Sequence, residues 1–346
     1  MDAIKWKNDH ISVIDAIMLP EQEYFHKYIN FREIGAAIEE NIIYGYGIRA
    51  IAIAMALALT AERNVTLSLD KYREILTFSV DYFEKITGTS ALYRTLFHTL
   101  RDVIQNGTDN STMVRLFKEE SINRFNQQTD AVKKIARNGV KFINNGDSIL
   151  LFSAAGSSLA TAGGGLVTSI LSEASKHNQE FTVYVAESRP DFSGSRIMAW
   201  EMVRHGFSVT VIPDIQIRQA LHSGEINKVM LAADAVHADG LFVGRSGIGM
   251  VAECAYNAEV PVYAVCPSYF FDESTTPGTS MENRAPITQV AFVKNTVTVP
   301  EGVSIRNFNT ETIPPRYITA LISDSAVIDN VENRLTSLFA GEAVRG

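Results

Sequence analysis

The spacing of apolar residues along the chain changes near residue 146. Before that point, apolar side chains recur at intervals of three and four, as amphipathic helices require. The segments with this period include FREIGAAIEENIIYGYG, LDKYREILTFSVDYFEKI and SALYRTLFHTLRDVIQNG. The stretch IRAIAIAMALALTA at 48–61 is apolar on nearly every face and predicts a buried helix. We therefore predict a helical region over about 31–145, preceded by a short β-hairpin at 4–14, where IKWKNDHISVI alternates around a turn.

After Asp147, short apolar runs without interruption alternate with helical segments. The runs, which we predict to be strands, are SILLFSA, FTVYVAES, SVTVIPD, KVMLAAD, VPVYAVCP and TQVAFV. Helices are expected at about 160–176, 194–205, 215–222 and 245–257. This alternation is typical of a parallel sheet that is covered on both faces. We predict an α/β fold with two domains, a helical one with a small hairpin at 1–145 and a Rossmann-like doubly wound, mostly parallel sheet at 146–346.

Composition narrows the classes of function. Hydrophobic residues make up 46% of the 346 residues, and the formal net charge is −8. The chain has no run of lysine and arginine, so it lacks the electrostatic footprint of nucleic-acid binding. Its longest apolar run is too short to span a bilayer, and its start does not resemble a signal peptide. Two cysteines, Cys254 and Cys266, are not in metal-ligand spacing, so we expect a cytoplasmic protein with no metal, nucleic-acid or membrane partner.

In a doubly wound sheet, ligands bind outside the carboxyl ends of the strands. Asp234 ends the fourth apolar run there. A carboxylate at such a strand end is partly desolvated, which raises its pKa and suits general acid–base chemistry. The alternative is that Asp234 is only a helix N-cap or a turn residue.

Two arginines at the same edge are candidate ligands for an anion. Arg189 follows the second strand, and Arg245 lies at the start of a predicted helix. The alternatives are a structural pair of Arg189 with Glu187, and a solvated surface position for Arg245.

The turn after the first strand, AAGSSLATAGGG, is neither G-x-G-x-x-G nor a P-loop, because it lacks the lysine. Its glycines at 163–165 fall too late to form the turn, and we expect them to allow close helix packing. Ser153, Ser157 and Ser158 can donate hydrogen bonds there. No neighbouring base is suggested for a serine nucleophile.

Several segments together resemble the family of methylthioribose-1-phosphate isomerases, which is related to ribose-1,5-bisphosphate isomerases and to the regulatory subunits of initiation factor 2B. They are IKWKNDHISVIDAIMLP, AAIEENIIYGYGIRAIAIAMALAL, GDSILLFSAAGSSLAT, AESRPDFSGSRIMAWEMVRHGFSVTVIPD and AADAV, in this order. The resemblance covers nearly the whole chain. It implies a homodimer built through the C-terminal domain, and chemistry that needs no cofactor.

The resemblance also implies roles for individual positions. Asp234 matches the catalytic aspartate of the isomerases, while the position of their catalytic cysteine falls on Ala154. Ser153 is the nearest hydroxyl, and Cys266 is another candidate for the missing thiol. The family's phosphate-binding positions fall on a set in which little of the positive charge is retained, namely Tyr44 with Gly45 and Tyr46, Ser90, Ser193, and Gly244 with Arg245. Arg49 and Arg94 lie close enough in sequence to replace the lost arginines.

Two functions stay open on the sequence. The first is a divergent aldose–ketose isomerase, an intramolecular oxidoreductase that acts on a ribose-1-phosphate-type sugar or a related small anionic polyol. In it, Asp234 shuttles a proton or hydride with Ser153 or a water, while Arg189, Arg245 and Arg49 hold the anion. The second is a non-catalytic regulatory protein that binds a sugar phosphate or nucleotide, as the relatives in initiation factor 2B do.

Overall fold

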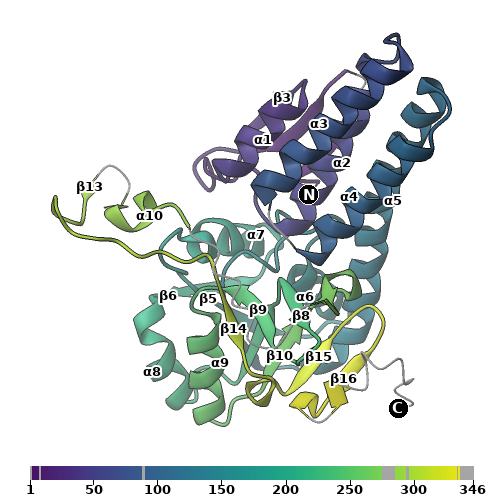
Figure 1. Ribbon diagram of the computed structural model, residues 1–346. Coiled ribbons are helices and arrows are strands. Elements are labelled where there is room, and N and C mark those ends of the chain that lie inside the picture. The colour runs from purple at the N-terminus through teal and green to yellow at the C-terminus, as the bar shows by residue number, and fades with distance from the viewer. Residues whose placement is uncertain are drawn as a thin grey trace.

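The N-terminal segment forms a small antiparallel sheet. The structure is a computed structural model that describes residues 2–7, 9–87, 90–274, 285–293, 296–332 and 334–335. Three strands, β1 (Ile4–Trp6), β2 (Ile11–Ile14) and β3 (Phe25–Tyr28), lie in the order β1-β2-β3 (Figure 1). The predicted hairpin of β1 and β2 is confirmed. The third strand, which pairs with β2, was not predicted from the sequence.

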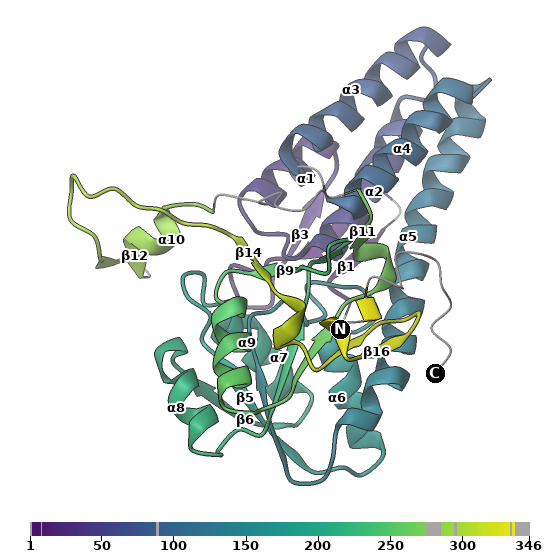
Figure 2. The same cartoon turned by 60° about the horizontal axis from the view of Figure 1, so that its bottom comes forward.

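Five helices follow, as the 3.6-residue period predicts. They are α1 (Phe31–Glu39), α2 (Tyr46–Arg63), α3 (Leu69–Thr87), α4 (Ala91–Asn106) and α5 (Asn110–Gly139). Every residue of α2 from Tyr46 to Ala61 is buried except Arg49, so the predicted all-round burial of this helix is confirmed. The 30-residue α5 lies alongside α2 and continues down beside the main sheet, where it packs on α6 (Leu166–Lys176) (Figures 1 and 2).

The main sheet has seven strands in the order β16-β15-β10-β7-β4-β5-β6. Their bounds are β4 (Asp147–Leu151), β5 (Phe181–Ala186), β6 (Ser208–Ile212), β7 (Lys228–Ala232), β10 (Val262–Val265), β15 (Ala320–Ile322) and β16 (Val327–Asp329). All neighbours are parallel except β15 and β16. The first strand, β4, lies between β5 and β7, so the chain winds away from it in both directions. The predicted doubly wound sheet is confirmed, and its ligand crevice belongs at the carboxyl ends of β4 and β7.

Helices cover both faces of this sheet. On one face α6 and α7 (Ala199–Arg204) pack on side chains such as Ile149 and Val183. On the other lie α8 (Ile217–His222) and α9 (Ile248–Asn257), which sit together in both views (Figures 1 and 2). The prediction of a helix from residue 160 was wrong, because α6 begins only at Leu166 and 152–165 form an irregular loop. The helix expected at 194–205 is present, and its first turn, Gly194–Met198, is π-helical.

A second sheet stands over the carboxyl edge of the first. It has the order β11-β8-β9-β14 and consists of β8 (Ala235–His237), β9 (Phe242–Arg245), β11 (Phe271–Asp272) and β14 (Thr310–Ile313). The prediction that TQVAFV is a strand of the main sheet was wrong. Its residues form α10 (Thr288–Ala291) and β12 (Phe292–Val293), and β12 pairs only with β13 (Thr296–Val297), away from the main sheet (Figure 1).

The helical and α/β parts share one hydrophobic core. The same buried cluster contains Leu57 of α2, Leu150 of β4 and Phe242 of β9. The change from helical to α/β structure falls between Gly139 and Asp147, near the expected boundary, while the division into two domains stays a prediction. None of the described helices is both long and apolar enough to cross a membrane.

Candidate functional site

The loop after β4 is shaped by serines and glycines. Ser153 has a left-handed backbone with φ +60, its N–H donates to Ser188 Oγ at 2.8 Å, and its own Oγ accepts from the Ala155 N–H at 3.3 Å. The buried carboxylate of Glu201 accepts hydrogen bonds from the Ser158 N–H at 3.0 Å and the Ser158 hydroxyl at 2.8 Å. In this loop, the N–H groups of Ser153 and Ser158 donate to side chains and not to helical carbonyls, which explains why α6 begins at Leu166 and not near residue 160.

The last three residues of this loop, Gly163, Gly164 and Gly165, all have positive φ, from +79 to +111. A Cβ on Gly163 would meet the Thr129 backbone of α5 at 2.8 Å, which confirms the expected close helix packing there. At Gly165 the obstructing atoms include the backbone of Ser157 and Ser158 in the same loop. The expectation that this glycine falls too late to form the turn was therefore wrong.

The loop also presses on the start of α2. Gly45 has φ +70 and, like Gly47, abuts Ala160, whose carbonyl accepts from the Ile48 N–H at 3.2 Å. Gln128 of α5 joins the two segments, because it donates to the Gly47 carbonyl at 2.8 Å and accepts from Ala162. The Tyr-Gly-Tyr-Gly sequence at 44–47 thereby places its two tyrosines beside the carboxyl edge of the main sheet.

Asp234 lies between β7 and β8, and its N–H donates to the Val243 carbonyl at 2.7 Å. The N-cap alternative is excluded because no helix starts there. Its side chain is 11% exposed, and Oδ2 has no hydrogen-bond partner among the described residues. Burial raises the pKa of Asp234, while the charges of Arg245 and Arg49 oppose that rise.

Arg245 is the nearest charge to Asp234, with 3.9 Å between Arg245 Nε and Asp234 Oδ2. It is buried, so the alternative of a solvated surface arginine was wrong. Its Nη1 donates to Asn309 Oδ1 at 2.7 Å, whereas Nε has no hydrogen-bond partner in the described part of the chain. Burial alone would lower its pKa, but Tyr44 and Asp234 raise it.

Two tyrosines cover the guanidinium. The Arg245 Cζ lies 4.9 Å from the ring centroid of Tyr44 and 5.9 Å from that of Tyr46. The Tyr44 hydroxyl is buried and has no hydrogen-bond partner among the described residues. Burial raises the pKa of Tyr44 to about 12. Asp234 Oδ2, Arg245 Nε and the Tyr44 hydroxyl are thus three buried polar groups that lack partners in one small region, as expected where a ligand completes the site.

Two small cavities border this region. The first, of about 10 Å³, is lined by Asp234 and Tyr46 and by Ser90 and Asp272 on the helix α4 and strand β11 side. The second, of about 20 Å³, is lined by residues from several segments of the chain, including Ser153, Arg189, Ser193, Arg245 and Asn309. Each cavity has room for little more than one water molecule.

The loop after β5 supplies the outer wall of the second cavity. Asp214 accepts from the main-chain N–H groups of Ser188 at 2.9 Å and Arg189 at 2.7 Å. The Arg189 guanidinium lies 4.7 Å from the centroid of the Phe192 ring, and no described carboxylate forms an ion pair with it, Glu187 included. Arg189 therefore keeps its charge available at the cavity.

Other candidates lie elsewhere. Arg49 donates to the Ile43 carbonyl and to Asn41 Oδ1, both at 2.8 Å, and borders neither cavity, so it holds the turn before α2. Arg94 donates to Asp272 Oδ1 at 2.7 Å and links α4 to β11. Cys266 is fully buried and borders neither cavity, and burial raises its pKa.

The remaining predicted positions are structural neighbours of the site. Gly244 packs on Ile248 directly before Arg245. Asn309 and Gln128 were not predicted from the sequence, because both act across long separations that no local pattern reveals. Among the described residues, no group of three histidine, cysteine or acidic side chains is placed to hold a metal ion.

Comparisons with known proteins support the resemblance. The profile of the Initiation factor 2 subunit family matches residues 43–330. A methylthioribose-1-phosphate isomerase of Geobacter sp. (strain M21) is 29% identical over 98% of this chain and 99% of its own, and one of Trichlorobacter lovleyi is 28% identical over 97% and 98%.

Solved structures share the fold. The 5-methylthioribose 1-phosphate isomerase of Pyrococcus horikoshii OT3 superposes with a TM-score of 0.88 at 22% identity, covering 98% of this chain and 96% of its own. The delta subunit of translation initiation factor eIF-2B from A. fulgidus gives 0.85 at 22% identity, with 98% and 99% covered.

Proposed function

Because the chain belongs to the Initiation factor 2 subunit family, we propose that it is an aldose–ketose isomerase that acts on a ribose-1-phosphate-type sugar or a related small anionic polyol. The curated relatives that carry the isomerase name match this chain from end to end, which supports the proposal. Asp234 is its acid–base group, and Arg189 and Arg245 hold the anionic end of the substrate. Asp234 moves a proton in either course of the reaction, because in a hydride transfer the hydride passes directly between the two substrate carbons.

The observation that carries this proposal is the gap between Asp234 and Arg245. Asp234 Oδ2 and Arg245 Nε are 3.9 Å apart and both lack a hydrogen-bond partner among the described residues. A sugar hydroxyl seated between them accepts a hydrogen bond from Nε–H and offers its own proton to Oδ2, at ordinary hydrogen-bond lengths. The arginine polarises the oxygen while the carboxylate receives the proton.

The raised pKa of Asp234 suits this role, because a more basic carboxylate takes up a proton more readily. A second carrier must return a proton to the neighbouring carbon or oxygen. The candidates are Ser153, which lines the second cavity, a water, and the Tyr44 hydroxyl, whose ring packs on Arg245 although it lines neither cavity. Arg49 is left out of the anion site because its guanidinium is already bound to Ile43 and Asn41.

The position of the isomerases' catalytic cysteine falls on Ala154, and this supports a second candidate, a regulatory protein that binds its ligand without catalysis. Volumes of about 10 and 20 Å³ do not admit a sugar phosphate. An isomerase of this structure must therefore open before substrate enters. A protein that only binds and signals needs no such cycle of opening at each turnover.

The deciding experiment separates binding from turnover. Wild type, Asp234→Asn and the surface control Asp81→Asn are incubated with ribose 1-phosphate and methylthioribose 1-phosphate in heavy water, and ketose and deuterium are followed by NMR. An isomerase forms ketose, and Asp234→Asn lowers the rate by at least about 100-fold while the control does not. A melting-temperature shift measures binding separately.

Each outcome selects one function. Ketose with solvent deuterium supports proton transfer, and ketose without deuterium supports hydride transfer. Binding without ketose contradicts the isomerase and leaves the regulatory protein, while no binding contradicts both the isomerase and a regulatory site for sugar phosphates. We also expect a homodimer through the C-terminal part, as the resemblance implies, and light scattering on the purified chain tests it.

A further inference from the structure

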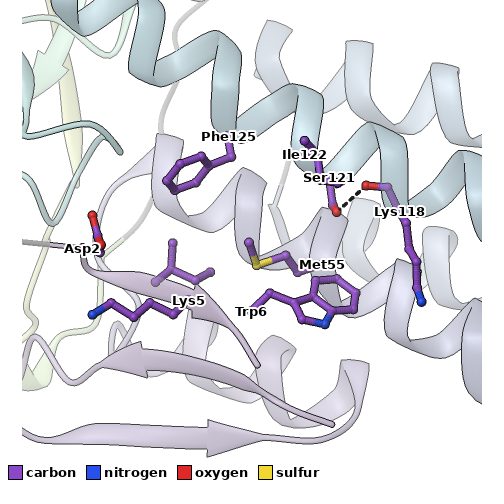
Figure 3. A pocket seen from close by; sticks show the side chains of 9 residues that line it. Asp2, Lys5, Trp6, Met55, Lys118, Ser121, Ile122 and Phe125 are labelled. Carbon is purple, nitrogen blue, oxygen red and sulfur yellow. Dashed lines mark hydrogen bonds between the residues drawn. The ribbon is translucent and has the colours of Figure 1, made fainter. Parts of the chain in front are cut away.

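A cavity of about 480 Å³ lies in the helical part of the molecule, between β1, α2 and α5 (Figure 3). One wall is a stripe of α5 made of Lys118, Ser121, Ile122 and Phe125, the facing wall is β1, and Met55 of α2 is the floor. Met55 is nine residues beyond Tyr46 along α2, which is roughly 14 Å at 1.5 Å per residue. None of its lining residues borders the cavities at Asp234, so this is a separate site.

The centre of this cavity is apolar. The rings of Phe125 and Trp6 stand on its two walls with the Met55 side chain between them (Figure 3). Ile122, which belongs to the α5 wall together with Phe125, is 58% exposed, so the structure leaves a hydrophobic surface uncovered. The volume falls in the range of small-molecule sites, which are mostly apolar with a few polar groups that fix orientation.

The two ends of the cavity differ in charge. At one end Lys118 forms an ion pair with Glu62 at 2.6 Å, so its charge is already balanced. At the other end of the cavity lie Asp2 and Lys5, and neither forms an ion pair within the described part of the chain (Figure 3). One anion and one cation without an ion pair among the described residues therefore border the same end of an apolar chamber.

We propose that this cavity binds a free α-amino acid with a large apolar side chain. The ammonium group of such a ligand pairs with the Asp2 carboxylate, and its carboxylate pairs with the Lys5 ammonium group. The apolar side chain then lies between Trp6, Phe125 and Met55. An apolar solute without charges would leave Asp2 and Lys5 unused, and an internal peptide segment carries no such pair of terminal charges.

The test uses Trp6 as the reporter. The chain has two tryptophans, so Trp200→Phe leaves Trp6 as the only source of tryptophan emission. The probe is p-bromo-L-phenylalanine, whose bromine quenches a neighbouring indole. We expect saturable quenching, and binding weaker by about tenfold for the N-acetyl amide of the probe, because it loses two exposed ion pairs. Calorimetric titration of the unaltered protein checks that Trp200→Phe has not changed the site.

Variants of residues that line the cavity test whether Asp2 and Lys5 recognise the two charges of the ligand. Asp2→Asn and Lys5→Met should each reduce the preference for the zwitterion, and Ile122→Glu should abolish binding. Ile215→Glu is the matched control, because Ile215 is 91% exposed and far along the chain from this cavity. Absence of saturable quenching, equal binding of the N-acetyl amide or of bromobenzene, or a zwitterion preference that survives both the Asp2 and the Lys5 variant overturns the proposal. These measurements use no sugar phosphate, so they are independent of the proposed isomerase.

Discussion

The Arg245 guanidinium lies over the face of the Tyr44 ring, with its central carbon 4.9 Å from the ring centroid. The tyrosine thus stabilises a buried cation through its ring while its hydroxyl stays without a partner among the described residues. Ring and hydroxyl can therefore be separated by mutation, and the hydroxyl is the part that is free to meet a ligand.

Tyr44→Phe should leave the melting temperature unchanged or slightly higher, because it removes a buried polar group that makes no hydrogen bond. If the hydroxyl contacts substrate, affinity falls by about tenfold. Tyr72→Phe is the control, since the Tyr72 hydroxyl donates to the Ala61 carbonyl at 2.9 Å away from the site. Its loss should cost about 1 kcal/mol of unfolding free energy without affecting binding. A destabilised Tyr44→Phe protein would contradict the assignment.

Stability should depend on pH through Asp234. Burial raises its pKa above the ordinary value of 3.8, so the folded protein keeps this proton to higher pH than the unfolded chain does. The contribution of the protonated form is complete below that ordinary value and is lost as pH rises through the folded pKa. The melting temperature of Asp234→Asn relative to wild type should therefore increase as pH rises from about 4.

Asp109 provides a control of opposite sign. It caps α5, and the hydrogen bonds with Thr112 lower its pKa. The stability that ionised Asp109 contributes is present above the unfolded pKa and is lost as pH falls through the folded pKa. The melting temperature of Asp109→Asn relative to wild type should therefore decrease as pH rises. Differences that do not change with pH, measured by thermal unfolding in a buffer series, would contradict the pKa direction for Asp234.

The glycines of the β4 loop should differ in their tolerance of alanine. Gly164 has φ +111 but open space around it, so Gly164→Ala should cost only backbone strain, about 1 kcal/mol. Gly165 has φ +79 and a Cβ there would meet the backbone of Ser157 and Ser158, so Gly165→Ala should cost at least about 2 kcal/mol more. Denaturant unfolding measures both, and equal losses would contradict the tight turn.

Arg196 should anchor the N-terminal segment to the loop after β5. Its guanidinium donates to the carbonyls of Ala16, Ile17, Leu19 and Asp191. Arg196→Met should lower the unfolding free energy by about 2 kcal/mol and speed proteolysis near residue 18. The control Arg204→Met breaks an exposed pair with Glu23 and should cost no more than about 1 kcal/mol. Equal effects would show that Arg196 is not an anchor.

The strands and the main helices could be predicted because their periods are local. KVMLAAD is buried on both faces, and this property marked both β7 and the strand end that carries Asp234. The start of α6 could not be predicted, since SLATA is composed of residues that tolerate a helix. What opposes the helix are bonds to distant residues, from Ser158 to Glu201 and from Ala162 to Gln128.

In the site, too, local sequence predicted the positions of the main candidates but not their partners from distant parts of the chain. The carboxyl-edge rule brought Asp234, Arg189 and Arg245 to one region without any contact being known. The partners of Arg245, by contrast, come from Tyr44 and Asn309, which lie on either side of it in the chain by 201 and 64 residues. Arg49 carries the same charge, yet Asn41, whose backbone is left-handed, binds it nearby, and nothing in the local sequence distinguishes the two arginines.

The anchor formed by Arg196 also has a consequence for biosynthesis. The Leu19 carbonyl and its donor are 177 residues apart, so at 5–20 residues per second the donor is synthesised roughly 10 to 35 s after the acceptor. Throughout that interval the N-terminal segment lacks the hydrogen bonds that Arg196 supplies. In a growing chain, the N-terminal segment is therefore open to chaperones until Arg196 has been synthesised. The formation of these hydrogen bonds shows that translation has passed the loop after β5.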